Sequence, residues 1–181
     1  MNYIIQDNFF NDPDNIRKYA LSQKYYTKKD HPEDVSSFPG YRTDYLHKSD
    51  LDIWNKIRSA LIPYISKLES VDDINEKYNK FNLQLSFSYT SKNSKSFRHI
   101  DSVAKGYKVR YGGLVYLYPK PLKKQGTTLY LKNTINLENK YNRLVLYKSN
   151  IEHEPTNNFG SDINNSRLVL TIFYDMGKES E

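Results

Sequence analysis

The chain has 181 residues, of which 38% are hydrophobic and 14% aromatic, enough for the core of one domain spanning residues 1–181. It contains no cysteine, which excludes disulfides, thiolate nucleophiles and cysteine-bound zinc, so any metal must be held by His, Asp or Glu. The net charge of +6 and 17 tyrosines raise the possibility of a nucleic-acid partner, but the lysines are dispersed along the chain, which favours a solvated surface. Neither a targeting segment nor a membrane span is apparent, and we expect a soluble cytoplasmic protein.

The first part of the chain, about residues 1–80, is predicted to be mainly helical. A short strand is expected at 2–6, and Asp12-Pro13 reads as an N-cap followed by proline at the first position of a helix over 13–24. A second helix is expected after Ser49-Asp50. Its buried stripe would consist of Leu51, Trp54, Ile57 and Leu61, and Pro63 would kink or divide it.

From about residue 81 to 175 the pattern changes to short strands separated by Gly, Pro, Asn and Ser. Five segments are rich in Leu, Val and Tyr: "LQLSFSYT", "VRYGGLVYLYP", "GTTLYLKN", "NRLVLYKS" and "SRLVLTIFYD". Weaker strands are expected near 99–102, 134–137 and 151–154. About eight strands can form two facing sheets or a closed barrel, with the N-terminal helices packed on the outer face of one sheet.

Two His-x-acid triplets occur in the sequence, His99-Ile100-Asp101 in "SFRHIDS" and His31-Pro32-Glu33 in a charged, proline-containing segment that reads as a turn. On a strand, the period of two points His99 and Asp101 to one face, as neighbouring ligands of one ion. A third ligand should come from another strand, and His153 follows the apolar strand "NRLVLYKS". Arg167 then opens the last strong strand.

This order of residues resembles the Fe(II)/2-oxoglutarate-dependent oxygenases, specifically the prolyl-hydroxylase-like branch. The matching segments are "YTSKNSKSFRHID", "GGLVYLYP", "QGTTLY", "NRLVLYKSNIEH" and "SRLVLTIFY", and "DNFFNDPDNIRKYAL" and "FPGYRT" are similar to small phage and bacterial members. The resemblance covers most of residues 3–175. It implies a mainly β, jelly-roll fold of the double-stranded β-helix type.

The resemblance also implies an activity and a set of site residues. His99, Asp101 and His153 would bind one Fe(II), and the cosubstrates 2-oxoglutarate and O2 would be converted with release of succinate and CO2. Arg167 would pair with the distal carboxylate of 2-oxoglutarate, with the hydroxyls of Tyr89 and Tyr116 completing its surroundings.

The substrate expected from the resemblance is a peptide or protein side chain, proline being the leading candidate, or another small polar molecule. Relatives often carry Ser or Thr two positions after the basic residue, where this chain has Val169. Three alternatives stay open: a jelly-roll binding module without catalysis, an oxidative nucleic-acid-modifying enzyme, and a hydrolase or isomerase that uses Zn(II) or Mn(II).

Overall fold

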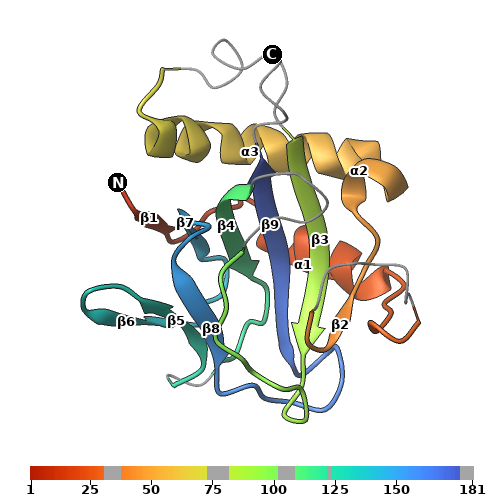
Figure 1. Ribbon diagram of the computed structural model, residues 1–181. Coiled ribbons are helices and arrows are strands. Elements are labelled where there is room, and N and C mark those ends of the chain that lie inside the picture. Colours follow the sequence, from red (N-terminus) through yellow and green to blue (C-terminus); the bar gives the residue numbers. More distant parts are fainter. Residues whose placement is uncertain (31–37, 73–81, 102–108, 122–123, 176–181) are drawn as a thin grey trace.

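The computed structural model describes residues 1–30, 38–72, 82–101, 109–121 and 124–175, and most of its regular structure is β (Figure 1). The elements in chain order are β1 (Tyr3–Gln6), α1 (Pro13–Ser22), β2 (Tyr41–Arg42), α2 (Leu46–Ser49), α3 (Leu51–Glu69), β3 (Asn82–Thr90), β4 (Val109–Tyr116), β5 (Gly126–Tyr130), β6 (Thr134–Glu138), β7 (Leu144–Lys148), β8 (Glu152–Thr156) and β9 (Arg167–Asp175). The five strong strands predicted from the sequence are therefore β3, β4, β5, β7 and β9.

The strands form two antiparallel sheets, one of order β1-β7-β4-β9-β3-β2 and one of order β6-β5-β8. A buried apolar cluster lies between the sheets. Its members come from both of them: Leu114, Tyr116, Leu129, Leu137, Val145, Tyr147, Ile151 and Val169. Sequence neighbours such as β3 and β4 are separated in the large sheet by β9, so the fold depends on pairing between distant segments. The predicted architecture of two facing sheets is confirmed.

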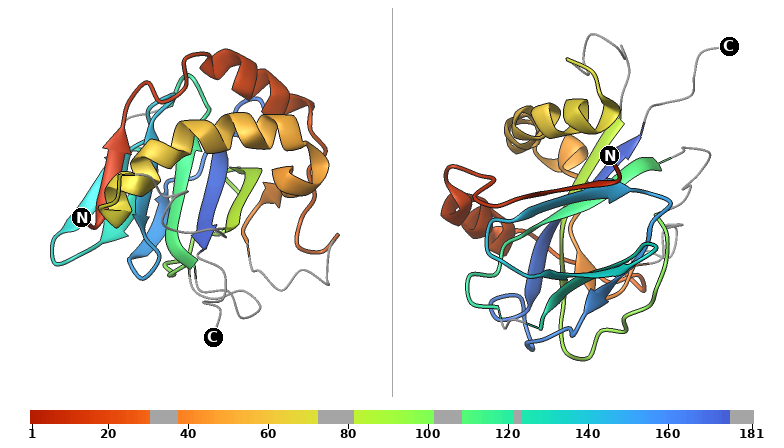
Figure 2. Two further views of the ribbon diagram at one scale, coloured as in Figure 1. Left: turned by 90° about the horizontal axis from the view of Figure 1, so that it is seen from above. Right: turned by 90° about the vertical axis from the view of Figure 1, so that its left-hand side faces the viewer.

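Helices α1 and α3 cover the face of the large sheet that points away from the small sheet (Figure 2). A second core forms there, to which the helices contribute Ile16, Ala20, Ile57, Leu61 and Ile65 and the large sheet contributes Leu85, Phe87, Leu168, Leu170 and Ile172. Burial of these apolar side chains is the main force that holds the helices on the sheet.

The caps of both long helices agree with the sequence, whereas the predicted burial of Leu51 in α3 does not. The carboxylate of Asp12 accepts a hydrogen bond from the N–H of Asn15, and that of Asp50 accepts one from Ile53. Leu51, predicted to be buried, is 58% exposed. Pro63 does not divide the helix, which continues to Glu69.

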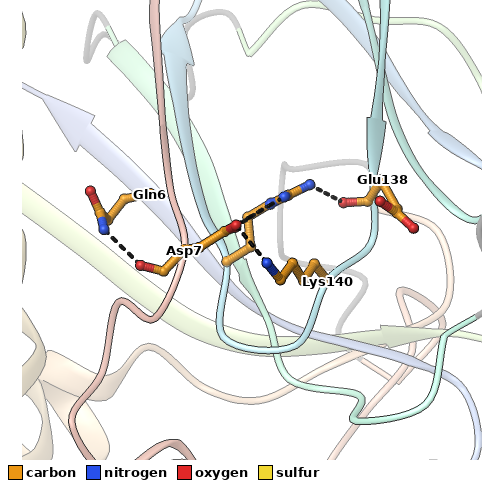
Figure 3. Close-up of polar contacts among 5 residues, drawn as sticks. Gln6, Asp7, Glu138 and Lys140 are labelled. Atoms are coloured by element: carbon orange, nitrogen blue, oxygen red, sulfur yellow. Dashed lines mark hydrogen bonds and ion pairs between the residues drawn. The ribbon is translucent and has the colours of Figure 1, made fainter.

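A salt-bridge network fixes the end of β1 against the segment between β6 and β7 (Figure 3). Arg143 donates to both carboxylate oxygens of Asp7, at 2.6 and 3.2 Å, and Lys140 donates to Asp7 at 2.7 Å. The same guanidinium donates to the carbonyl of Glu138 at 3.1 Å. These two cations lower the pKa of Asp7 from 3.8 to about 2.

None of the helices in the described part of the chain combines the length and the apolar character that crossing a bilayer requires.

Candidate metal centre

His99, Asp101 and His153 meet at one point although 54 residues separate the two histidines in the sequence. The backbones of His99 and His153 exchange two hydrogen bonds, of 3.0 and 2.8 Å, and the N–H of Asp101 donates to the carbonyl of Ser149 at 3.0 Å. The expected strand over 99–102 is reduced to this one bridge at His99, and residue 102 lies outside the described residues. This single bridge to His153 of β8 nevertheless brings the three side chains together.

The distances between the three side chains suit a single shared ion. Asp101 Oδ1 lies 3.8 Å from His99 Nε2, and Asp101 Oδ2 lies 3.5 Å from His153 Nε2. One donor atom from each residue lies within 4.8 Å of the other two. Two ligand atoms bonded at right angles to one ion, each at about 2.1 Å, are about 3 Å apart, so a small contraction would complete the site.

Backbone carbonyls orient both imidazoles. His99 Nδ1 lies 2.9 Å from the carbonyl of Phe97, and His153 Nδ1 lies 3.0 Å from the carbonyl of Ile151. Because a carbonyl oxygen can only accept, each Nδ1 donates its proton there, and in the neutral imidazole the lone pair is then on Nε2. Both lone pairs are then on the atoms that face Asp101, the arrangement that metal-binding histidines adopt.

Asp101 is a buried carboxylate that lacks a full set of partners. Its side chain is 8% exposed, and its Oδ2 atom has no hydrogen-bond partner among the residues that the structure describes. Burial raises the pKa of Asp101 against the opposing effect of the two histidines, and burial also lowers the pKa of His153. Because an ionised carboxylate is costly to bury without a counter-charge, a cation at this position would stabilise it.

Two residues of the large sheet shape the space around Asp101. Gly112 of β4 is paired with Tyr147 of β7, and a Cβ atom at Gly112 would lie 2.0 Å from Asp101 Oδ2. Glycine is therefore required for the carboxylate to reach this position. The ring of Tyr147 packs on His153, with centroids 4.5 Å apart, and its side chain interacts with that of Asp101, which lowers the pKa of Asp101.

Arg167 is buried between the sheets without a carboxylate partner among the described residues. It is 5% exposed, and its Nη2 donates to Thr127 Oγ1 at 3.0 Å, whereas its Nε has no hydrogen-bond partner in the described part of the chain. The guanidinium lies over the ring of Tyr116, whose hydroxyl is 2.7 Å from the same Thr127 oxygen. After burial, which is the main cause, its positive charge also contributes to lowering the pKa of His153. An anionic ligand would supply the missing counter-charge.

Of the two tyrosines assigned to the cosubstrate, Tyr116 points into the interior and Tyr89 does not. Tyr89 stacks on Tyr41, with centroids 4.6 Å apart, and packs with the core on the helix side of the large sheet. In β3 the side chain that shares a face with Arg167 belongs to Thr90, the direct partner of Arg167 in the register. The inward direction predicted for Tyr89 is wrong, because strand alternation turns it to the opposite face.

Sequence reasoning did not assign three residues of this interior: Gly112, Thr127 and Tyr147. Each was in a segment already identified as a strand. Strand alternation from Tyr116 and from Val145 would have turned Gly112 and Tyr147 inward, whereas the contact between Thr127 and Arg167 depends on how the two sheets face each other.

The other two histidines play no part in this cluster as far as the structure describes them. His47 lies in α2, where its ring stacks on Tyr45 at a centroid distance of 5.7 Å. The His31-Pro32-Glu33 triplet lies outside the described residues.

No protein-family model matches this sequence, and no curated protein is significantly similar to it. Solved structures are nevertheless similar to it in fold. An oxidoreductase of the 2OG-Fe(II) oxygenase family from Burkholderia pseudomallei superposes with a TM-score of 0.69 at 8% identity, over 97% of this chain and 85% of that one. The viral collagen prolyl hydroxylase of Paramecium Bursaria Chlorella virus-1, solved as its 2-oxoglutarate complex, gives 0.57 at 15% identity, over 98% and 97%.

A third similar structure is the Trichoplax adhaerens prolyl hydroxylase, in complex with a peptide fragment of the hypoxia-inducible-factor oxygen degradation domain. It superposes with a TM-score of 0.61 at 16% identity, over 98% of this chain and 84% of that one. All three comparisons cover both sheets and the N-terminal helices. The fold of this chain is therefore that of the 2-oxoglutarate- and Fe(II)-dependent oxygenases, the double-stranded β-helix predicted from its sequence.

Proposed function

We propose that this chain is an Fe(II)- and 2-oxoglutarate-dependent dioxygenase that hydroxylates a C–H bond in a peptide or protein side chain, with proline as the leading candidate. One observation carries the proposal. Two imidazole Nε2 atoms and a buried carboxylate with an unpartnered oxygen share an interior with a buried guanidinium that has no carboxylate partner among the described residues. The two imidazoles with the carboxylate suit a divalent metal, and the guanidinium suits a dicarboxylate.

His99, Asp101 and His153 would hold the iron on one side and leave its other positions free for cosubstrate and oxygen. When bound, iron and 2-oxoglutarate supply the oxidising chemistry, in which one oxygen atom of O2 enters the substrate and the other enters succinate, with loss of CO2. The chain's own contribution is to bring the three ligand side chains together and to orient both imidazoles. The carbonyls of Phe97 and Ile151 fix both imidazoles before the metal arrives.

Arg167 would bind the distal carboxylate of 2-oxoglutarate through its planar guanidinium. Tyr116 and Thr127 lie beside it with hydroxyls that can donate to the same carboxylate. Thr127 would thereby provide the second contact that Val169, at the position where relatives often carry Ser or Thr, cannot make. The water-excluding interior strengthens each of these charge-assisted hydrogen bonds.

A peptide substrate is favoured by the exposed side of the site and by the similar structures. The side chain of His99 is about one-third exposed, whereas those of Asp101 and His153 are buried, so access is from the His99 side. The Trichoplax adhaerens enzyme was solved with a bound peptide, and the chlorella-virus enzyme is described as a collagen prolyl hydroxylase.

The test is mass spectrometry of a proline-containing peptide library and of alkylated oligonucleotides, each incubated with the protein, Fe(II), 2-oxoglutarate and oxygen. We expect a gain of one oxygen on peptides, matched by succinate formation and abolished in His99→Ala. His47→Ala is the matched control and should retain activity, because His47 lies in α2 away from the cluster. Turnover confined to oligonucleotides would contradict the peptide assignment, and absence of succinate with every substrate would contradict the enzyme class.

A further inference from the structure

An open cleft has Phe97, the ring neighbour of His99, in its wall. It has a volume of about 450 Å³ and is lined by the segment 38–41, by the loop 91–97 that follows β3, and by Thr27. A volume of this size is within the range of sites that bind small ligands or short peptide segments. The cleft is a separate feature from the buried interior that contains Arg167.

Aromatic rings with one free face form part of the cleft. Tyr41 stacks on Tyr89 in a nearly parallel arrangement, 5° between the planes, and Tyr25 packs edge-on against Tyr89 from behind. One face of Tyr41 is thus covered, yet the residue remains 37% exposed. Phe97 is 39% exposed. Exposed, well-supported aromatic surfaces of this kind mark interaction sites.

The loop 91–97 is fixed before any ligand binds. Ser91 and Ser94 exchange two hydrogen bonds, of 2.9 and 3.0 Å, that close a tight turn. Asn158 donates to the carbonyl of Ser94 and to the hydroxyl of Ser96, and the N–H of Lys92 donates to the carbonyl of Gly160. A preorganised wall lowers the entropic cost of binding.

Phe97 connects the cleft directly to the metal centre. Its ring lies 4.9 Å from that of His99, and its carbonyl accepts the hydrogen bond from His99 Nδ1. A ligand that packs on Phe97 in the cleft would therefore lie one side chain away from the exposed metal-ligand candidate.

Lys95 gives the cleft a positive charge. It is the only cationic side chain among the described lining residues, it is exposed, and it has no ion-pair partner in the described part of the chain. A groove with aromatic rings suits an extended proline-containing segment, because the polyproline II conformation packs its rings on aromatic faces. An isolated cation beside those rings favours a nearby carboxylate.

We infer that this cleft binds an extended, proline-containing peptide segment with an acidic side chain opposite Lys95. The inference rests on the proposed function and narrows its substrate class to acidic, proline-containing sequences. A single-stranded nucleic acid would also stack on aromatic rings, but it requires a row of cations along its phosphates. One lysine at the cleft does not provide that row.

The experiment measures binding of labelled short peptides to the full-length chain by fluorescence anisotropy, at low and at high salt. Three peptides are compared: in the first, proline alternates with glutamate, in the second with alanine and in the third with lysine. A single-stranded oligonucleotide is the fourth probe. We expect the glutamate peptide to bind about threefold more tightly than the alanine peptide, as for an exposed ion pair, with the difference shrinking in high salt. Tyr41→Ala should weaken binding of all three peptides about fivefold.

Charge reversal provides the decisive comparison. In Lys95→Glu the lysine peptide should bind more tightly than the glutamate peptide, whereas in Lys92→Glu, on the same loop but not lining the cleft, the parent's order should persist. Retention of the glutamate preference in Lys95→Glu, loss of it in Lys92→Glu, or preference for the oligonucleotide would overturn the inference.

Failure of the inference can be told apart from failure of the proposed function, because peptide binding in this assay requires no turnover. The same preparation is assayed for succinate formation with Fe(II) and 2-oxoglutarate. Succinate formation without the predicted order of peptides would refute only the cleft assignment. The predicted order without succinate or metal binding would refute only the oxygenase assignment.

Discussion

Replacing Arg167 with methionine separates the two halves of the candidate site. Methionine has a similar length and no charge, so it keeps much of the packing between the sheets while removing the guanidinium. The variant loses the hydrogen bond to Thr127, but it also removes a buried cation that has no carboxylate partner among the described residues. The metal-ligand candidates belong to other segments and remain in place.

The size of the effect follows from the burial of Arg167. Truncating one partner of a desolvated charge pair typically costs about 2–5 kcal/mol, which corresponds to a rise of at least roughly 30-fold in the dissociation constant. Titration calorimetry of the Mn(II)-loaded protein with 2-oxoglutarate measures that constant without turnover. We expect Arg167→Met to lose most of this affinity while its Mn(II) affinity stays within about twofold of the parent's.

Thermal unfolding gives an independent reading of the same variant. Without 2-oxoglutarate, Arg167→Met should unfold at the parent's temperature or above it, because the uncompensated buried charge is gone. Addition of 2-oxoglutarate should raise the unfolding temperature of the parent but not that of the variant. If the variant binds 2-oxoglutarate as tightly as the parent, the assignment of Arg167 is wrong.

Three further variants test the surroundings of the site and the stability of the fold. Tyr147→Phe removes only the hydroxyl that interacts with Asp101. We expect it to weaken metal binding about tenfold in a Co(II) titration with little loss of stability. An unchanged Co(II) affinity would contradict this role of Tyr147. Gly112→Ala should displace Asp101 and abolish metal binding, and a variant that binds Co(II) normally would refute the predicted clash. The Asp7 carboxylate has its pKa lowered to about 2, so its contribution to stability is complete above about pH 4 and is lost as the pH falls toward 2. Because Asp7 is 34% exposed, screening reduces that contribution to about 1 kcal/mol, and urea unfolding of Asp7→Asn should show this loss at pH 7 but not at pH 2.

The parts of the fold that depend on local sequence were predictable. Asp12 and Asp50 cap their helices as expected, and the five strands rich in Leu, Val and Tyr are present. Local signals failed where tertiary context decides. Leu51 of the predicted buried stripe is exposed, and the two-residue strand β2 has too few residues to produce a periodic pattern.

The clustering of the three ligand candidates was predictable from the sequence, and the surroundings of the candidate site were less so. His99 and Asp101 share one direction, as the spacing of two requires, although they lie in an irregular segment rather than in the predicted strand. Tyr89 was misassigned because the face that a strand residue occupies depends on the register of the whole sheet. The contact of Thr127 with Arg167 crosses between the two sheets, and no sequence period encodes such a contact.

The most direct test of the account is anaerobic visible spectroscopy of the protein with Fe(II) and 2-oxoglutarate. The chelate of the cosubstrate on iron gives a weak charge-transfer band, and it forms only if His99, Asp101 and His153 hold the metal with two adjacent positions open. We predict that the band appears in the parent and in His47→Ala and is absent in His153→Ala. Absence of the band in the folded parent, or its persistence in His153→Ala, would contradict the central claim.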